Sequence, residues 1–285
     1  MNLGSIWNVF WVLLIFYSLW PLFQQRQVFS QRVGMLRRIE QNRGTRVIAM
    51  IHRQESVAIL GIPLASYIDI EDSEQVLRAI RLTPPDLPID IILHTPGGLV
   101  LAAEQIAHAI AGHPSRVAVF VPHYAMSGGT LLALAADEIH MDENAVLGPV
   151  DPQIGDYPAA SILAAAHAKP VERLDDQTLI LADIAGKALS QMRHHVRQIL
   201  AGRMGDEDAS RLAETLTEGR WTHDFPLTPA DLEALGLKVG TGLPEDIYKL
   251  MDLYPQAARR RPSVQYVPLP YQGPADPRRS GTQRH

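Results

Sequence analysis

The chain has 285 residues, 46% of them hydrophobic, which is enough to bury a full core in one large domain or two small ones. A formal net charge of −5 and an isoelectric point near 6.1 argue against a nucleic-acid-binding protein, which usually carries a basic patch. The sequence contains no cysteine, so disulfides, a cysteine nucleophile and a thiolate metal site are excluded.

The N-terminal segment has the features of a membrane anchor. Residues 1–25 carry no charged side chain, and the apolar run 6–23 would span about 27 Å as a helix. Aromatic residues such as Trp7 and Trp20 fall near its ends, where amphipathic rings settle at a membrane interface. A cleaved signal peptide would need a basic start and a small-x-small cleavage site, and neither is present. We therefore predict a single uncleaved transmembrane helix in residues 1–25; a buried helix of a soluble core is the alternative.

Residues 26–45 form a basic linker after this anchor. Five arginines lie between Arg26 and Arg43 against one acidic residue, Glu40, and residues 29–42 are predicted to be helical. By the positive-inside rule this flank stays in the cytoplasm. The sequence thus predicts a single-pass protein that contacts the lipid bilayer, with its main domain on the cytoplasmic side.

Strands and helices alternate after the linker. Strands are predicted at 46–51, near 57–62, at 89–93, 117–121 and 138–141; helices are predicted from Ser73 to Thr83, over 100–110 and over 130–136. Strands that alternate with helices indicate an α/β architecture with a parallel sheet.

The pattern becomes helical beyond Asp151. Helices are predicted at 159–168, 175–200 and 206–217, and Thr228-Pro229 is a capping start for another. Residues 46–256 are interpreted as one domain, in which the later helices cap the site and help the chain to oligomerise. Residues 257–285 are rich in Arg, Pro and Gly and are predicted to be a disordered tail.

Two glycine signatures carry the chemical information. Residues 94–98 read His-Thr-Pro-Gly-Gly and residues 125–130 read Ala-Met-Ser-Gly-Gly-Thr, each between a strand and a helix. Glycine pairs at such turns let the backbone approach a ligand and leave N–H groups open at a helix start. Two such turns would place two N–H donors around one oxygen, with the hydroxyl of Ser127 beside them. Acyl-transfer chemistry needs this layout of nucleophile and oxyanion hole; an N-capping serine is the simpler alternative.

These two units resemble the ClpP/crotonase fold, and more narrowly its membrane-associated serine peptidases, the SppA type and the serine dehydrogenase proteinase family. The segments 147–153, 219–224 and 253–256 are similar to the latter family, and the resemblance runs from about residue 46 to residue 270. It implies a spiral of βαβ units behind a transmembrane helix. It also implies a membrane-anchored serine peptidase, a homo-oligomer that cleaves peptides or membrane-protein segments through an acyl-enzyme.

The resemblance assigns roles to individual residues. Ser127 would be the nucleophile, the backbone N–H groups of Gly98 and Gly128 would hold the oxyanion, and Gly97 would provide the turn. ClpP-type enzymes have a histidine about 25 residues after the serine, but this region of the chain contains none. The SppA-type peptidases suggest a lysine instead, and Lys169 is the candidate for a Ser–Lys dyad. Its alternative role is a cation at a helix C-terminus.

The other candidate groups are less strongly indicated. His123 and Asp151 are predicted to line the substrate pocket, and His123 is the alternative base. No ligand spacing predicts a metal site and no Gly-x-Gly-x-x-Gly turn predicts a dinucleotide, so no cofactor is expected. Two rival functions stay open, a crotonase-like acyl-CoA enzyme and a non-catalytic membrane-associated scaffold.

Overall fold

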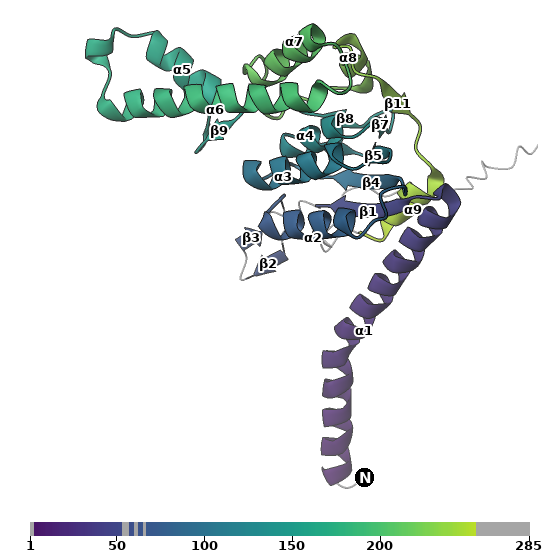
Figure 1. Ribbon diagram of the computed structural model, residues 1–285. Coiled ribbons are helices and arrows are strands. Elements are labelled where there is room, and N and C mark those ends of the chain that lie inside the picture. The colour runs from purple at the N-terminus through teal and green to yellow at the C-terminus, as the bar shows by residue number, and fades with distance from the viewer. Residues whose placement is uncertain (1–2, 53–56, 60–61, 65–66, 255–285) are drawn as a thin grey trace, which may run out of the picture.

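A five-stranded parallel sheet forms the centre of the protein (Figure 1). The computed structural model describes residues 3–52, 57–59, 62–64 and 67–254. Along the sheet the strands lie in the order β1 (Arg46–Ile51), β4 (Ile89–His94), β5 (Val117–Val121), β7 (Glu138–Met141) and β11 (Val239–Thr241). The α/β architecture predicted from the sequence is confirmed, and β11 is a strand that the sequence analysis did not predict.

The sheet has a hydrophobic core on each face. Ile91 of β4 and Val119 of β5 belong to the larger core, whereas Ile92 and Phe120, one position further along, belong to the smaller one. This alternation follows from the two-residue period of a strand, and it explains why both strands are apolar throughout. The helices α2 (Ile70–Arg81), α3 (Val100–Ala111) and α4 (Gly128–Ala135) cover the first face, and α9 (Glu245–Asp252) covers the second together with the end of α1.

Helix α2 begins three residues before the predicted start at Ser73. Asp69 is its N-cap and forms a capping box with Asp72, in which each side chain accepts a hydrogen bond from the other residue's backbone N–H at 3.0 Å. The serine lies inside the first turn, where its hydroxyl donates to Gln105 of α3 at 2.8 Å. The prediction of the start was wrong because two acidic residues, and not the serine, satisfy the free N–H groups.

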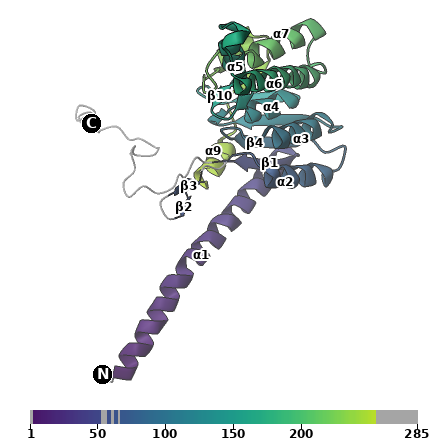
Figure 2. The ribbon, with the colours of Figure 1, turned by 90° about the vertical axis from the view of Figure 1, so that its left-hand side faces the viewer.

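Helix α1 (Leu3–Arg43) is continuous, so the helical segment predicted at 29–42 is its C-terminal part. It projects away from the domain in both ribbon views (Figures 1 and 2). Among the described helices, α1 included, none is both long and apolar enough to span a membrane. The C-terminal half of α1 is bonded to the domain at Arg32, whose Nε donates to the carbonyl oxygen of Leu253 at 2.8 Å.

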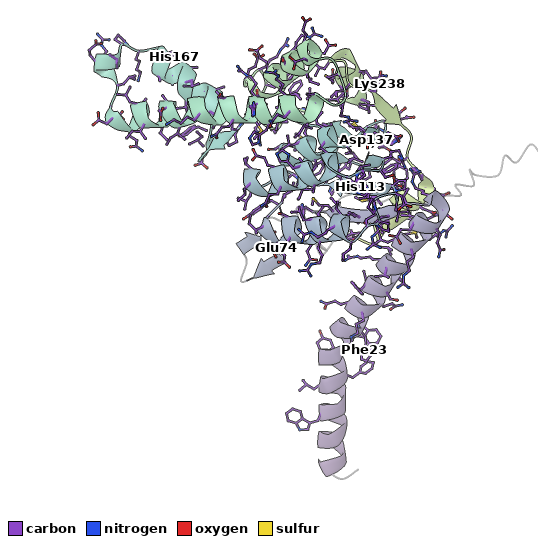
Figure 3. All side chains as sticks on the ribbon, viewed as in Figure 1. Phe23, Glu74, His113, Asp137, His167 and Lys238 are labelled. Carbon is purple, nitrogen blue, oxygen red and sulfur yellow. The ribbon has the colours of Figure 1, made fainter. Side chains whose placement is uncertain are left out.

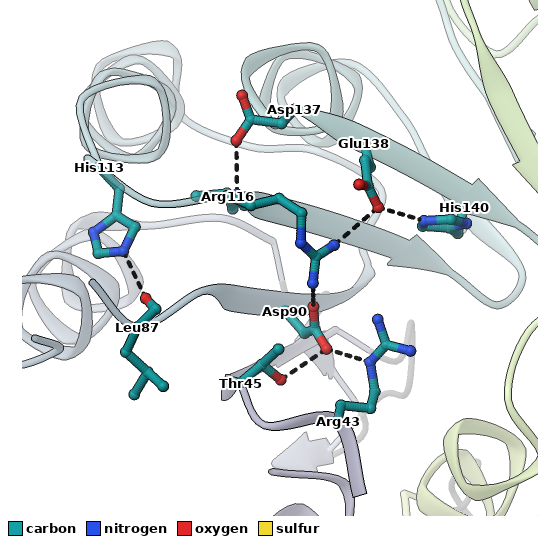
Figure 4. Close-up of polar contacts among 10 residues, drawn as sticks. Arg43, Thr45, Leu87, Asp90, His113, Arg116, Asp137, Glu138 and His140 are labelled. Carbon is teal, nitrogen blue, oxygen red and sulfur yellow. Dashed lines mark hydrogen bonds and ion pairs between the residues drawn. The ribbon is translucent and has the colours of Figure 1, made fainter. Parts of the chain in front are cut away.

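A buried carboxylate fastens the end of α1 to the sheet. Asp90 of β4 is 1% exposed and accepts hydrogen bonds from Arg43, Arg116 and the hydroxyl of Thr45 (Figure 4). Arg116 continues the network to Glu138 at the start of β7. Two guanidinium groups and a hydroxyl compensate the desolvation of this charge, and the network joins α1 to three neighbouring strands of the sheet.

The first two helices after Asp151 form an arm beside the sheet. Helices α5 (Ala159–His167) and α6 (Asp176–Leu200) pack together as a hairpin whose connection includes a short 3₁₀ helix, Val171–Arg173. The far end of the hairpin extends beyond the sheet, whereas the C-terminal half of α6 packs on α4 and on α7 (Asp206–Thr217) (Figure 1). Helix α8 (Pro229–Ala234) follows, capped by Thr228 as predicted.

Short strand pairs complete the fold. These are β2 (Val57–Ile59) with β3 (Ile62–Leu64), β6 (Tyr124–Ala125) with β8 (Val146–Leu147), and β9 (Gln153–Ile154) with β10 (Tyr157–Pro158). The strand predicted near 57–62 is therefore a hairpin of two strands. The predicted tail, 257–285, lies outside the described residues.

Candidate active site

Two loops meet where the neighbouring strands β4 and β5 end. Thr95 and Ala125 form a parallel bridge, in which Thr95 N donates to Tyr124 O at 3.2 Å and Met126 N donates to Thr95 O at 3.0 Å. The carboxyl ends of parallel strands are the usual position of a ligand site in an α/β sheet. The fold thus brings the two glycine signatures together.

The first signature approaches the second so closely that side chains would not fit. Gly97 has φ +104°, and a Cβ there would lie 2.8 Å from the Cβ of Ser127 and 2.9 Å from the carbonyl oxygen of Met126. Gly98 lies against the backbone of Ile68, whose oxygen would be 2.2 Å from a Cβ. Ile68 N donates to Gly97 O at 2.7 Å and Leu99 N donates to Ile68 O at 2.8 Å, so this pairing leaves the Gly98 amide between them unused.

A series of polar contacts through Thr95, His52 and Asp72 stabilises the first loop. The Thr95 hydroxyl accepts a hydrogen bond from Gly97 N at 3.2 Å and contacts His52 Nδ1 at 2.9 Å. His52 Nε2 in turn lies 3.1 Å from Asp72 Oδ2 at the start of α2. Partial burial of Asp72 opposes its ionisation, but the hydrogen bonds from His52 and from the Asp69 backbone hold its pKa below 3.8.

Ser127 adopts a strained backbone conformation at the start of α4. Its φ of +50° and ψ of −115° make it the one non-glycine residue with positive φ in the described part of the chain. Its side chain makes no capping hydrogen bond, so the alternative interpretation of an N-capping serine does not hold. Backbone strain of about 1–3 kcal/mol at a serine is typical of a site where a nucleophile is presented, and it must be maintained by the surrounding structure.

Two amide groups lie beside this serine. Gly128 is the first residue of α4, where helical N–H groups have no partner within the helix. A Cβ at Gly128 would lie 3.7 Å from Gly98 N, which shows how near the two loops are. Among the described residues, neither amide donates a hydrogen bond to the backbone of another loop or to a side chain. The two N–H groups are therefore available to an oxygen of a ligand, as an oxyanion hole requires.

A cavity of about 390 Å³ opens over this arrangement. Its walls come from the two loops, from α3, α4 and α6, and from two segments further along the chain. The lining residues are Pro96, Gly98, Leu99, Val100, Ala103, Ser127, Gly128, Leu131, Val150, Asp151, Pro152, Gln153, Met192 and His223. Apolar walls with a few converging polar groups are typical of a substrate pocket.

An ion pair crosses the wall opposite the glycine loops. His223 Nδ1 lies 2.8 Å from Asp151 Oδ1, and Gln153 Nε2 donates to Asp151 Oδ2 at 2.6 Å. The hydrogen bond that His223 donates to Asp151 raises the pKa of His223 above 6.5, against the opposing effect of its own burial. Asp151 is thus in the pocket wall where the sequence analysis expected it, and it holds a histidine that the analysis did not select.

Lys169 and Ser127 are not brought together within one chain. Lys169 is exposed and lies in the connection between α5 and α6, away from the residues that line the cavity. His167, two residues earlier, is on the part of the arm that extends beyond the sheet (Figure 3). The Ser127–Lys169 dyad stays a prediction that a single chain does not assemble.

His123 is also outside the group of residues that line the cavity. Its ring is exposed and stacks against the ring of His94, with centroids 5.7 Å apart. It follows β5 but precedes the bridge that directs the chain to Ser127. Its predicted role in substrate binding has no support from its position.

The sequence analysis missed His223 and Gln153 as site residues. Both lie in segments that it had singled out, residues 219–224 and 147–153, but only as family signatures. The signal that the sequence offers is His223 in one of these motifs and Asp151 in the other, since neither residue has an obvious local structural role. Their pairing depends on contacts between residues 72 positions apart, which spacing does not predict.

A strained serine with two amide donors at the ends of parallel strands defines a serine hydrolase of the α/β class. The whole chain matches one family of this class: it belongs to the ClpP-like SDH-type serine proteinases, matched over residues 1–280. The resemblance inferred from the glycine signatures is confirmed, and the protein is a serine-type peptidase.

Close relatives occur in Methanocaldococcus jannaschii. One uncharacterized protein is 56% identical over 265 residues, which cover 93% of this chain and 90% of the relative. A second is 55% identical over 268 residues, which cover 94% of each chain. Among solved structures, a mutant of the 1510-N membrane-bound stomatin-specific protease is 21% identical with a TM-score of 0.44; the match covers 66% of this chain and 79% of that one.

Proposed function

We propose that the protein is a membrane-anchored peptidase in which Ser127 attacks the peptide carbonyl and forms an acyl-enzyme. The observation that carries this proposal is the position of Ser127, strained and without a capping bond, beside the amides of Gly98 and Gly128 in the same cavity. In the tetrahedral intermediate these amides would stabilise the oxyanion. One such donor is typically worth about 10²–10³ in rate.

The base that activates Ser127 has two candidates. Lys169 is proposed from the resemblance to SppA-type peptidases, and in this arrangement it would have to come from the arm of another copy of the chain. The exposed apolar side chains Leu179, Ile180 and Ile184 on α6 support a homo-oligomer, because a single chain leaves this face uncovered. The second candidate is His223, a histidine that already lines the cavity.

Membrane attachment is proposed from the sequence of the first 25 residues, which carry no charge and include the apolar run 6–23. By the positive-inside rule, the arginines that follow favour a cytoplasmic position for the peptidase domain. The hydrogen bond from Arg32 to Leu253 and the Arg43–Asp90 contact would hold the domain in a fixed orientation to this anchor. If the full chain leaves the membrane fraction in an alkaline carbonate wash, the anchor is wrong.

The nucleophile is tested by covalent labelling of the full chain in mild detergent. A fluorophosphonate probe should label Ser127, and Ser127→Ala should lose both the label and the hydrolysis of casein. Ser190→Ala, which alters an exposed serine on α6, is the matched control and should keep both. Undiminished casein hydrolysis by Ser127→Ala would refute the nucleophile. Tight binding of a CoA thioester without labelling would favour an acyl-CoA enzyme instead.

A further inference from the structure

The titratable side chains in the cavity wall are few. Of the residues that line the cavity over the described part of the chain, only Asp151 and His223 have an acidic or basic side chain, and no lysine is among them. Ser127 lines the same cavity. A general base must reach the proton it removes, directly or through one water. Within one chain, therefore, Asp151 and His223 are the candidates for the base.

Hydrogen bonding fixes which nitrogen of His223 carries the proton. The Asp151 carboxylate can only accept, so Nδ1 of His223 must donate to Oδ1 at 2.8 Å. The amide of Gln153 donates to the other carboxylate oxygen at 2.6 Å and cannot accept from the same Nδ1. In the neutral ring the lone pair is therefore on Nε2, and the described residues provide no hydrogen bond to that atom.

A purely structural role explains the Asp151–His223 ion pair less well than a role in proton transfer. Asp151 is 1% exposed, and a buried carboxylate needs a partner to offset its desolvation. Gln153 and the ring of His223 satisfy that need. However, His223 itself is 36% exposed and lines the cavity instead of packing into the core. A histidine held by a buried carboxylate on one side and open on the other is arranged as a proton carrier.

We infer that His223 is the general base for Ser127, and that Asp151 and Gln153 position it. This inference rests on the proposed role of Ser127 as the nucleophile. Nε2 takes the proton of the Ser127 hydroxyl as Oγ bonds to the peptide carbonyl carbon. The imidazolium then gives this proton to the amine nitrogen as the C–N bond breaks. A water repeats the cycle: Nε2 takes its proton, its oxygen bonds to the acyl carbon, and the proton returns to Ser127 Oγ as the ester bond breaks.

The rate of this step depends on pH with a defined sign. Only neutral His223 can accept a proton, so the rate should rise with pH through the pKa of His223. Asp151 and, at longer range, Asp224 raise that pKa above 6.5. Asp151→Asn removes the charge that raises it, so the midpoint of the profile should move down towards 6.5. The same variant lowers the plateau rate, since an asparagine can turn its amide to Nδ1 and favour the wrong tautomer.

The experiment compares rates of fluorophosphonate labelling for full-length variants in mild detergent. His223→Ala should slow labelling by about 10²–10⁴-fold, the usual contribution of a general base. Added imidazole should restore part of the His223→Ala rate, because it can occupy the vacated space and accept the proton, and it should do nothing for Ser127→Ala. The control is His194→Ala, which removes an exposed histidine on α6 and should label like the wild type. Thermal unfolding confirms that each variant is folded.

The outcomes separate this inference from the proposed function. If the wild type is not labelled at Ser127, the proposed function fails. If the wild type is labelled and His223→Ala is labelled equally fast, the inference fails and the nucleophile stands. Lys169→Met tests the rival directly: a folded Lys169→Met that is not labelled, beside a His223→Ala that is, establishes the Ser–Lys dyad and overturns His223.

Discussion

Gly97→Ala is expected to damage stability and catalysis together, because the contact it disturbs is with the nucleophile itself. The new Cβ would lie 2.8 Å from the Cβ of Ser127 and 2.9 Å from Met126 O, where ordinary contacts begin at 3.4 Å. The positive φ of +104° costs about 1–2 kcal/mol for a residue with a Cβ. Overpacking adds about 1–3 kcal/mol. A total of roughly 2–5 kcal/mol lowers the melting temperature by about 4–20 °C for a domain of this size.

The matched control separates strain from overlap. Gly236 has φ +90° and nothing within 4 Å of a Cβ, so Gly236→Ala carries the backbone strain without the contact. It should lower the melting temperature by about 2–8 °C. Ser127 must shift by several tenths of an ångström to accommodate the methyl group that Gly97→Ala adds, and misplacement on this scale should slow labelling roughly ten- to hundredfold. The reasoning is refuted if Gly97→Ala has the same melting temperature as Gly236→Ala and is labelled at the wild-type rate.

Further variants test three properties of the fold: the backbone strain, the buried charge and the sensitivity to acid. Ser127→Gly should melt higher than Ser127→Ala, since relief of about 1–3 kcal/mol of strain exceeds glycine's entropic cost of about 0.5–1 kcal/mol; equal melting temperatures would contradict the strain. Asp90→Asn should destabilise by roughly 3 kcal/mol, because it leaves two guanidinium groups, 28% and 33% exposed, beside a neutral side chain. Glu138→Gln, at a 45% exposed carboxylate, should cost under about 1 kcal/mol; a similar loss in both variants counts against the Asp90 network. The pKa of Asp72 lies below 3.8, so its contribution to stability is present above pH 3.8 and is lost as pH falls through that lower pKa. When the free energy of unfolding is measured against pH, Asp72→Asn should remove this part of the loss at low pH. If the loss at low pH is unchanged, the hydrogen bond to His52 is unimportant for stability.

The parts of the fold that the sequence predicted well are those with strong local signals. The strands 117–121 and 138–141 and the helix 206–217 were predicted at the bounds the structure has, because apolar runs and acidic helix starts mark them. Strand β11 has only three residues and is specified by its parallel pairing with β7, which depends on tertiary structure. No local pattern could have distinguished it from a loop.

The glycine signatures succeeded as predictors for a different reason. The first loop needs glycine because backbone approaches it, that of Ile68 at Gly98 and that of Met126 at Gly97. In the second loop a Cβ at Gly129 would lie 2.6 Å from Cγ2 of Thr95, so both signatures record a steric requirement that is independent of the substrate. The close approach of the Gly97 loop to Ser127 belongs to the surrounding structure that must hold this serine at φ +50°. A steric requirement of this kind is visible in the residue types alone.

The choice of base shows the opposite case. Lys169 is predicted to be the base because of the family resemblance and because the chain has few lysines. Neither consideration shows where the side chain lies in the fold. The contact between Asp151 and His223 exists because Leu147 and Leu227 pair as a short antiparallel bridge, with N–O distances of 3.0 and 2.8 Å, and this bridge brings the His223 loop against the Asp151 segment. Each segment alone lacks a pattern that predicts the other. Since an aspartate and a histidine gain a catalytic geometry only from such a pairing, residues in two motifs without a local structural role should be tested together, in the fold, before a base is assigned from spacing.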